Sequence, residues 1–203
     1  MDRLRQWLVP RERGAIFIAL LALFMAVYFG AALVPPWRTP SSLPWDPVWR
    51  IPFVPIFILP YISAYVMPLI AFAIPYERMA FRRMALAYAG AIVVAGAGFI
   101  LVPLAPPHPA DVGSGALGAL VRMEYAIDVT RNLFPSLHVA ISFLNAFAVA
   151  RFLPRRRLIA FLWAGLIAAS TLFVRQHFAI DVAGGLLLAI AAWRIAFPKP
   201  RGA

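Results

Sequence analysis

The chain has 203 residues, of which 63% are hydrophobic and only 13% are charged. This composition excludes an ordinary water-soluble domain, because too little polar surface is present to cover a globule that faces water. The net charge of +11 could indicate a nucleic-acid partner, but the basic residues lie in short clusters between apolar runs, as topology signals do, so we expect no nucleic acid.

The first half of the chain contains two apolar runs. Residues 15–34 follow a basic segment, and twenty such residues at about 1.5 Å each span roughly 30 Å of hydrocarbon, which predicts a transmembrane helix. A cleaved signal peptide is the alternative. Residues 35–50 are rich in proline and tryptophan, which is typical of an irregular segment at a membrane interface. The second run, 51–74, contains Pro52, Pro55, Pro60 and Pro68, which predict a bent or kinked span.

Four more apolar runs follow a short basic loop at 76–83. Residues 84–104 are dense in alanine and glycine, which lets neighbouring backbones approach closely. Residues 105–132 are expected to form a loop on the outer face, in which 116–127 could be a short interfacial helix. The last three runs are 135–152, 158–174 and 178–197. The sequence therefore predicts one all-α domain, 1–203, built as a bundle of six transmembrane helices.

The distribution of charge predicts how this bundle is oriented. If both ends lie on one side, that side carries segments 1–14, 75–83, 151–157 and 194–203, which hold 14 of the 19 basic residues. Cytoplasmic loops are enriched in Lys and Arg, so both termini are expected in the cytoplasm. All three histidines then lie on the outer face. We expect a bacterial inner-membrane protein whose active site faces the periplasm.

Two polar breaks between the runs carry the candidate catalytic residues. His138 begins the fourth run and His177 precedes the sixth, and antiparallel helices would bring both to the same depth. Asp181 lies four residues after His177, one helical turn away. Its carboxylate can hold one ring nitrogen and leave the other free as a nucleophile or base. Because an ionised carboxylate facing lipid would cost several kcal/mol, Asp181 should face the bundle interior.

Residues beside these breaks are candidate phosphate ligands. The turn before His138 opens a helix N-terminus, which presents unpaired N–H groups to an anion, and Ser136 adds a hydroxyl. Arg131 and Arg175 can supply forked donors for phosphate oxygens, or can simply anchor lipid headgroups. His108, between prolines in a loop, is interpreted as incidental. Without cysteine and with only three histidines, we expect no metal site.

The segment Phe134-Pro135-Ser136-Leu137-His138, followed by His177-Phe178-Ala179-Ile180-Asp181-Val182-Ala183-Gly184-Gly185, resembles the type-2 phosphatidic acid phosphatase superfamily over about residues 50–195. That superfamily includes lipid phosphate phosphatases, undecaprenyl diphosphate phosphatases and sphingolipid phosphotransferases. The resemblance implies a six-helix core, no metal or other cofactor, and a phosphohistidine intermediate on His177. It also implies that His138 protonates the leaving group and that Asp181 supports His177.

Two features of the superfamily's phosphatases are missing. Their Ser-Arg pair ahead of the second histidine is replaced here by Ser170 and Thr171, and their upstream Lys-x6-Arg-Pro motif has no counterpart. With Ala105-Pro106-Pro107 ahead of the first motif, the chain is more similar to the branch of fungal inositol phosphorylceramide synthase. That branch transfers a phosphoalcohol headgroup between lipids.

Three functional hypotheses follow. The first, which we favour because water is always available as an acceptor, is a phosphatase that hydrolyses a lipid phosphate or diphosphate. The second is a phosphotransferase that moves a headgroup from a phospholipid to a lipid alcohol. The third is a non-catalytic lipid-binding or transport protein. The expected partners are a lipid phosphate or phospholipid substrate and the membrane, and the sequence leaves the oligomeric state open.

Overall fold

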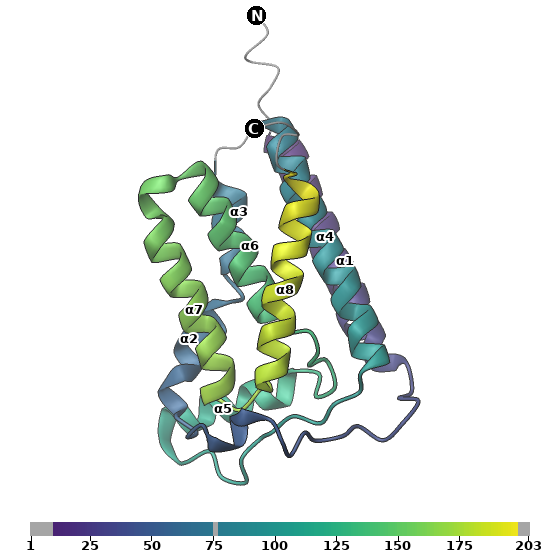
Figure 1. Ribbon diagram of the computed structural model, residues 1–203, viewed down its shortest axis with the longest axis vertical. Helices are drawn as coiled ribbons and strands as arrows, with labels where there is room; N and C mark the ends of the chain where they lie inside the picture. Colours follow the sequence, from purple (N-terminus) through teal and green to yellow (C-terminus); the bar gives the residue numbers. More distant parts are fainter. Residues whose placement is uncertain (1–9, 75–76, 199–203) are drawn as a thin grey trace, which may run out of the picture.

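The computed structural model describes residues 10–74 and 77–198, and within them the chain is helical and contains no β-strand. The long helices lie side by side along one axis (Figure 1): α1 (Pro10–Leu33), α4 (Arg78–Leu101), α6 (Leu137–Phe152), α7 (Arg157–Phe173) and α8 (Ala179–Ala196). Helices α1, α4 and α7 end where α6 and α8 begin, and we call this end of the bundle the site end. Parts of the expected cytoplasmic clusters lie outside the described residues, namely Arg3, Arg5, Lys199 and Arg201.

The second expected span is broken, as its prolines predict. A 3-10 turn, η3 (Pro55–Phe57), leads into α2 (Ile58–Ser63), and α3 (Met67–Ala73) follows after a turn. Pro68 has no N–H to donate to the carbonyl of Ala64 four residues earlier, which interrupts the hydrogen-bond ladder between α2 and α3. Residues 51–54 were expected inside the span but are not helical.

Helix α4 begins earlier than the sequence analysis expects. The basic segment assigned to a loop is helical from Arg78 onward. Arg78 and Arg82, one turn apart on α4, both pair with Glu12 of α1, at 3.0 Å and 2.5 Å. These ion pairs join α1 to α4 at the end of the bundle opposite the site end.

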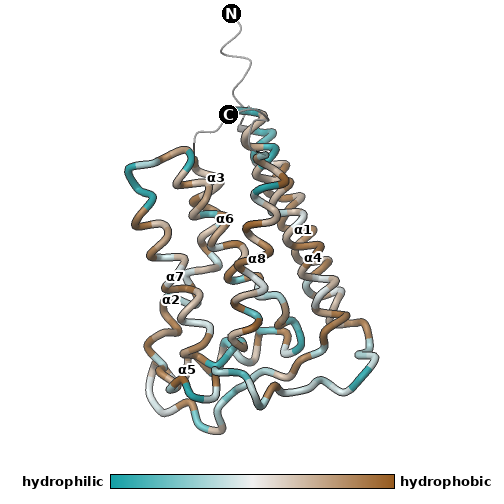
Figure 2. The backbone as a smooth tube through the Cα atoms, viewed as in Figure 1, coloured by the Kyte–Doolittle hydropathy of each residue, from teal (hydrophilic) through white to brown (hydrophobic). Residues whose placement is uncertain are grey.

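Within the described residues, five stretches are long and apolar enough to cross a membrane: Arg11–Leu33, Pro55–Ala73, Arg78–Leu101, Pro154–Phe173 and Ala179–Ala196. Apolar residues dominate the middle of these helices (Figure 2), which fits an integral membrane protein. The helix that carries His138, α6, has only 16 residues. At about 1.5 Å per residue it covers roughly 24 Å. The six-span count and the sidedness of the bundle therefore stay predictions.

Helix α6 is the central helix, because it packs against α3, α4, α7 and α8. Loops and two short helices, η2 (Pro47–Arg50) and α5 (Gly115–Ile127), cover the site end. Helix α5 lies close to the predicted range 116–127, and its place at a membrane interface stays a prediction. The two loops that follow α1 and α4 are joined through Ser41, whose N–H donates to Pro103 and whose carbonyl accepts from Ala105. The remaining 3-10 turn, η4 (Pro154–Arg156), connects α6 to α7 at the opposite end.

Candidate active site

Two glycines bring the histidine motifs together. A Cβ on Gly185 of α8 would lie 2.4 Å from the carbonyl oxygen of Ser136, and a Cβ on Gly184 would lie 2.6 Å from the ring of Phe134. Only glycine allows α8 to approach the turn before α6 this closely. The contact is fixed by a hydrogen bond from the Ser136 N–H to the carbonyl of Asp181, at 3.1 Å.

Ser136 is the N-cap of α6. Its hydroxyl oxygen accepts from the N–H of Val139 at 3.4 Å, and the residue is fully buried. A serine at this position is a common helix start, since it satisfies one of the free N–H groups of the first turn. The expected phosphate ligand thus has a capping contact as well, and its O–H remains able to donate.

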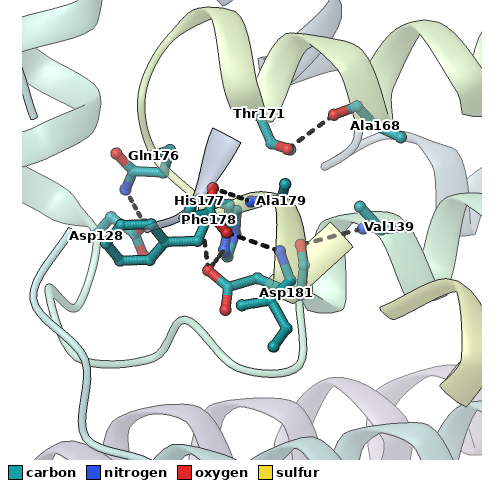
Figure 3. A network of polar contacts seen from close by, with 12 residues as sticks. Asp128, Val139, Ala168, Thr171, Gln176, His177, Phe178, Ala179 and Asp181 are labelled. Atoms are coloured by element: carbon teal, nitrogen blue, oxygen red, sulfur yellow. Dashed lines mark hydrogen bonds and ion pairs between the residues drawn. The ribbon is translucent and has the colours of Figure 1, made fainter. Parts of the chain in front are cut away.

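His177 and Asp181 form the pair that the sequence predicts, but by a different geometry (Figure 3). His177 lies just before α8, so the two residues do not share a helix face. Instead the Asp181 carboxylate folds back over the helix start, where Oδ2 accepts from the Phe178 N–H at 2.8 Å and lies 3.4 Å from His177 Nδ1. The ring therefore keeps Nε2 for other chemistry. Asp181 is fully buried and its Oδ1 has no hydrogen-bond partner among the described residues.

A second buried carboxylate, which the sequence analysis did not identify, holds the start of α8. Asp46 accepts hydrogen bonds from Ala179 at 3.0 Å, from Ile180 at 3.2 Å and from Val48 at 2.9 Å. The Asp-Pro start of η2 is a readable capping signal in the sequence. The bond to a helix 133 residues away is not readable there. Because Asp46 occupies these N–H groups, the N-terminus of α8 is already paired with an anion.

His138 faces His177 across a distance of 5.8 Å between ring centroids. Its ring packs against two tyrosines of the broken span, Tyr61 at 4.5 Å and Tyr65 at 5.5 Å. The His138 Nε2 atom is buried and has no hydrogen-bond partner among the described residues. Two histidines with one free ring nitrogen each therefore stand at the starts of α6 and α8.

A family model described as the PAP2 superfamily matches residues 51–195, which include both histidine motifs and more than half of the chain. The chain belongs to the PAP2 superfamily. Members of this superfamily are generally phosphatases or phosphotransferases. No curated protein is similar enough to this chain to count as a relative. Helix α1 and the loop that follows it precede the part that the superfamily model covers.

The two arginines expected to bind phosphate donate to backbone carbonyls instead. Arg131 donates to the carbonyl of Ala32 at 2.6 Å, at the end of α1, and Arg175 donates to Ile51 at 2.6 Å. Arg175 also has a φ of 54°, which is unusual for a residue other than glycine and reverses the chain between α7 and His177. The structure thus gives both arginines a role in holding loops, and their phosphate role stays a prediction.

The positions that carry the Ser-Arg pair in the superfamily's phosphatases hold no cation here. Ser170 and Thr171 are fully buried in α7, and their hydroxyls donate to the carbonyls of Ile167 at 2.6 Å and Ala168 at 2.8 Å. Both side chains are therefore satisfied within their own helix. Among the described residues, no group of three or more His, Asp or Glu side chains is placed to hold a metal ion.

A polar network surrounds the loop before His177. Gln176 donates to the Asp128 carboxylate and contacts Nε2 of His108 at 2.7 Å, while the hydroxyl of Tyr28 donates to the same carboxylate. His108 also stacks on Tyr125, with ring centroids 3.6 Å apart. Burial raises the pKa of Asp128 above its usual value and lowers the pKa of His108. His108, interpreted as incidental from the sequence, is thus tied to the residue next to His177.

A third buried acid lies on the other side of His138. Glu124 of α5 is only 2% exposed and accepts from the hydroxyl of Tyr65, whose ring packs on His138. Burial raises the pKa of Glu124. The structure therefore surrounds the histidine pair mainly with carboxylates and tyrosines, and not with the arginines and lysines that the sequence analysis looked for.

Proposed function

We propose that this protein is a membrane-embedded enzyme that cleaves a phosphate ester of a lipid through a phosphohistidine intermediate on His177. The observation that carries the proposal is the placement of His138 and His177 with ring centroids 5.8 Å apart, each with an unoccupied Nε2, and with a buried carboxylate on one of them. Phosphoryl transfer needs a nucleophile and an acid for the leaving oxygen, and this pair supplies both.

In the first step, His177 Nε2 attacks the phosphorus and the bond from phosphorus to the leaving oxygen breaks. Asp181 accepts the hydrogen bond from Nδ1 and stabilises the positive charge that develops on the ring. His138 gives its proton to the leaving oxygen. The 3.4 Å separation between His177 Nδ1 and Asp181 is long for a hydrogen bond, and we expect it to shorten once phosphate is bound.

In the second step, an acceptor hydroxyl attacks the phosphohistidine. The acceptor gives its proton to His138, which is now neutral, and the bond between phosphorus and Nε2 breaks. With water as acceptor the reaction is hydrolysis, which makes the protein a lipid phosphatase. With a lipid alcohol as acceptor the same two steps transfer a phosphoalcohol headgroup.

One observation favours headgroup transfer as a second candidate. Ser170 and Thr171 replace the Ser-Arg pair, and Arg131 and Arg175 donate to backbone carbonyls. Few cations are then available to neutralise a phosphate monoester, which carries about two negative charges near neutral pH. A phosphodiester carries one negative charge and suits this site better. Such a diester donor is what headgroup transfer requires.

The test compares two leaving groups in purified protein. With a lipid phosphate, His177→Ala and His138→Asn should both lose activity, the latter by about 10²–10⁴-fold because general acid catalysis is lost. With a nitrophenyl phosphate ester, whose leaving oxygen needs no proton, His138→Asn should still release the first equivalent of nitrophenol rapidly, and its later turnovers should stay slow because His138 also takes the proton of the acceptor. His177→Ala should release no such first equivalent. This difference separates the nucleophile from the acid.

The same assay is run on a phosphodiester lipid with and without a lipid alcohol. Release of inorganic phosphate from the lipid phosphate supports the phosphatase, and a new phospholipid that forms from the phosphodiester only with the alcohol supports the transferase. If His177→Ala retains the turnover of the parent protein, the proposed mechanism is wrong. If no phosphate compound is turned over at all, the non-catalytic lipid-binding hypothesis is favoured.

A further inference from the structure

A largely apolar cavity of about 420 Å³ begins at His138 and runs along α1. Its volume lies within the usual range for small-molecule sites. Four of the polar residues on its walls lie at the end next to the candidate active site, namely His138, Tyr65, Asp128 and Asn132, whereas Tyr88 packs against Phe72 farther along. The remaining walls come from apolar side chains of α1, α3, α4 and α6. We call this cavity the tail groove.

Helix α1 supplies one wall through a single face. The lining residues recur at helical spacing: Phe17, Leu20, Leu21, Phe24, Met25 and Tyr28. From Tyr28 at the polar end to Phe17 is eleven residues, or roughly 16 Å along the helix axis. Phe17 meets Phe72 of α3 edge to face at 5.1 Å and narrows the far end. The groove is therefore elongated, and most of the polar residues on its walls lie at the end next to His138.

The groove is open toward the surface that would face lipid. Met25 of α1 is 48% exposed and Leu69 of α3 is 53% exposed, although both line the groove. The main packing partner of α1 is α4, where Gly96 accommodates the side chain of Val27. A hydrocarbon chain can thus enter sideways from a bilayer between α1 and α3.

Helix α1 is also fixed to the candidate active site. The Tyr28 hydroxyl donates to Asp128, which accepts from Gln176 beside His177, and the Tyr28 carbonyl accepts from Asn132 at 2.7 Å. These bonds hold the polar end of the groove next to the histidine pair. Helix α1 precedes residue 51, where the superfamily match begins, so this wall is a feature of this chain outside the matched part.

We propose that the tail groove holds one hydrocarbon tail of the lipid substrate and that α1 selects the length of that tail. The inference rests on the proposed function, because it places the phosphate at His138 and His177 and the tail beside α1. A tail that reaches Phe17 buries more apolar surface than one that ends near Tyr28. Long-tailed lipids should therefore be preferred.

The test measures kcat/KM for dipalmitoyl and dioctanoyl versions of the same lipid. Leu21→Trp should fill part of the groove and lower the palmitoyl-to-octanoyl ratio about tenfold, the effect of displacing about two methylenes. Phe17→Ala should open the far end and raise the ratio. Ile18→Trp is the matched control, because Ile18 lies on the same helix, is 66% exposed and does not line the groove. Its ratio should match that of the parent protein.

Native mass spectrometry provides a readout that needs no turnover. All three proteins that are compared carry His177→Ala, so that bound lipid is not turned over. His177→Ala alone and its combination with Ile18→Trp should retain bound dipalmitoyl lipid, and its combination with Leu21→Trp should retain less of it. Equal ratios and equal lipid retention in Leu21→Trp and Ile18→Trp would overturn the assignment of α1. A protein that binds lipid selectively but turns over no phosphate compound would refute the proposed function and leave the tail groove in place.

Discussion

Asp46 provides a direct test of how the start of α8 is held. Its carboxylate is 2% exposed and accepts three N–H groups, two of which belong to the first turn of α8. His177 lies two residues before Ala179, the first of these donors. We therefore expect Asp46→Ala to destabilise the protein and to displace His177 from His138.

The magnitude follows from the three bonds. Loss of the cap on η2 costs about 1 kcal/mol. The other two N–H groups are only part-buried, so each costs about 1–2 kcal/mol when it loses its acceptor, and Asp46→Ala should cost roughly 3–5 kcal/mol in total. Asp46→Asn keeps one oxygen, and Oδ1 alone serves Val48 and Ala179, so only the bond to Ile180 is lost and the cost should be about 1–2 kcal/mol.

The assay is thermal unfolding of the detergent-solubilised protein, followed by tryptophan fluorescence. At about 2–4 °C per kcal/mol for a chain of this size, Asp46→Ala should lower Tm by about 10 °C and Asp46→Asn by a few degrees. Asp111→Ala is the matched control, because Asp111 is exposed and accepts only from Gly113 in its own turn, at 2.8 Å. Equal melting of Asp46→Ala and Asp111→Ala would refute the reasoning.

Two further predictions follow from packing and from burial. Gly185→Ala should cost about 1–3 kcal/mol and reduce activity, because its Cβ would lie 2.4 Å from the carbonyl oxygen of Ser136. In contrast, Gly165→Ala on α7, where nothing lies within 4 Å, should be neutral or stabilising in the same melting assay. Burial raises the pKa of Asp128, so the folded state favours the protonated form, and stability is lost as pH rises through that raised pKa. Asp128→Asn should reduce the fall of Tm with rising pH. Part of the fall should remain, because the pKa of Glu124 is raised as well. An unchanged curve of Tm against pH would contradict the contribution of Asp128.

The histidine pair was predictable because its signals are strong in a membrane chain. Polar residues are rare between apolar runs, so His138, His177 and Asp181 stand out in the sequence. Antiparallel spans place the starts of the fourth and sixth runs at one end of the bundle. The cooperation of His177 with Asp181 was predicted as well, but from helical spacing, whereas the structure forms it by capping the N-terminus of α8.

The groups around the pair were not predictable in the same way. Asp46 lies in an irregular loop, and the sequence contains no periodicity that relates it to α8. Tyr65 and Glu124 meet only because the broken span turns between α2 and α3 and because α5 lies across the site end. Charge alone does not distinguish a phosphate ligand from a side chain that holds a loop, so the phosphate role of Arg131 and Arg175 stays a prediction.

The short length of α6 connects the fold to the chemistry. Helix α6 covers roughly 24 Å, against about 30 Å for the hydrocarbon core, and its basic last turn and η4 place its other end near the opposite interface. His138 at its start is then recessed by about one helical turn below the level that the longer helices reach. On the proposed function and the predicted six-span topology, a lipid phosphate descends by this distance to reach His138. Asp46, Glu124 and Asp181 are buried near that depth, as expected for a site that is shielded from bulk water. The low dielectric constant of such a site strengthens every charge interaction with the phosphate. On the proposed function, the loops over the site end exclude water from the phosphate, and the tail groove along α1 stabilises the hydrocarbon tail as the lipid moves inward.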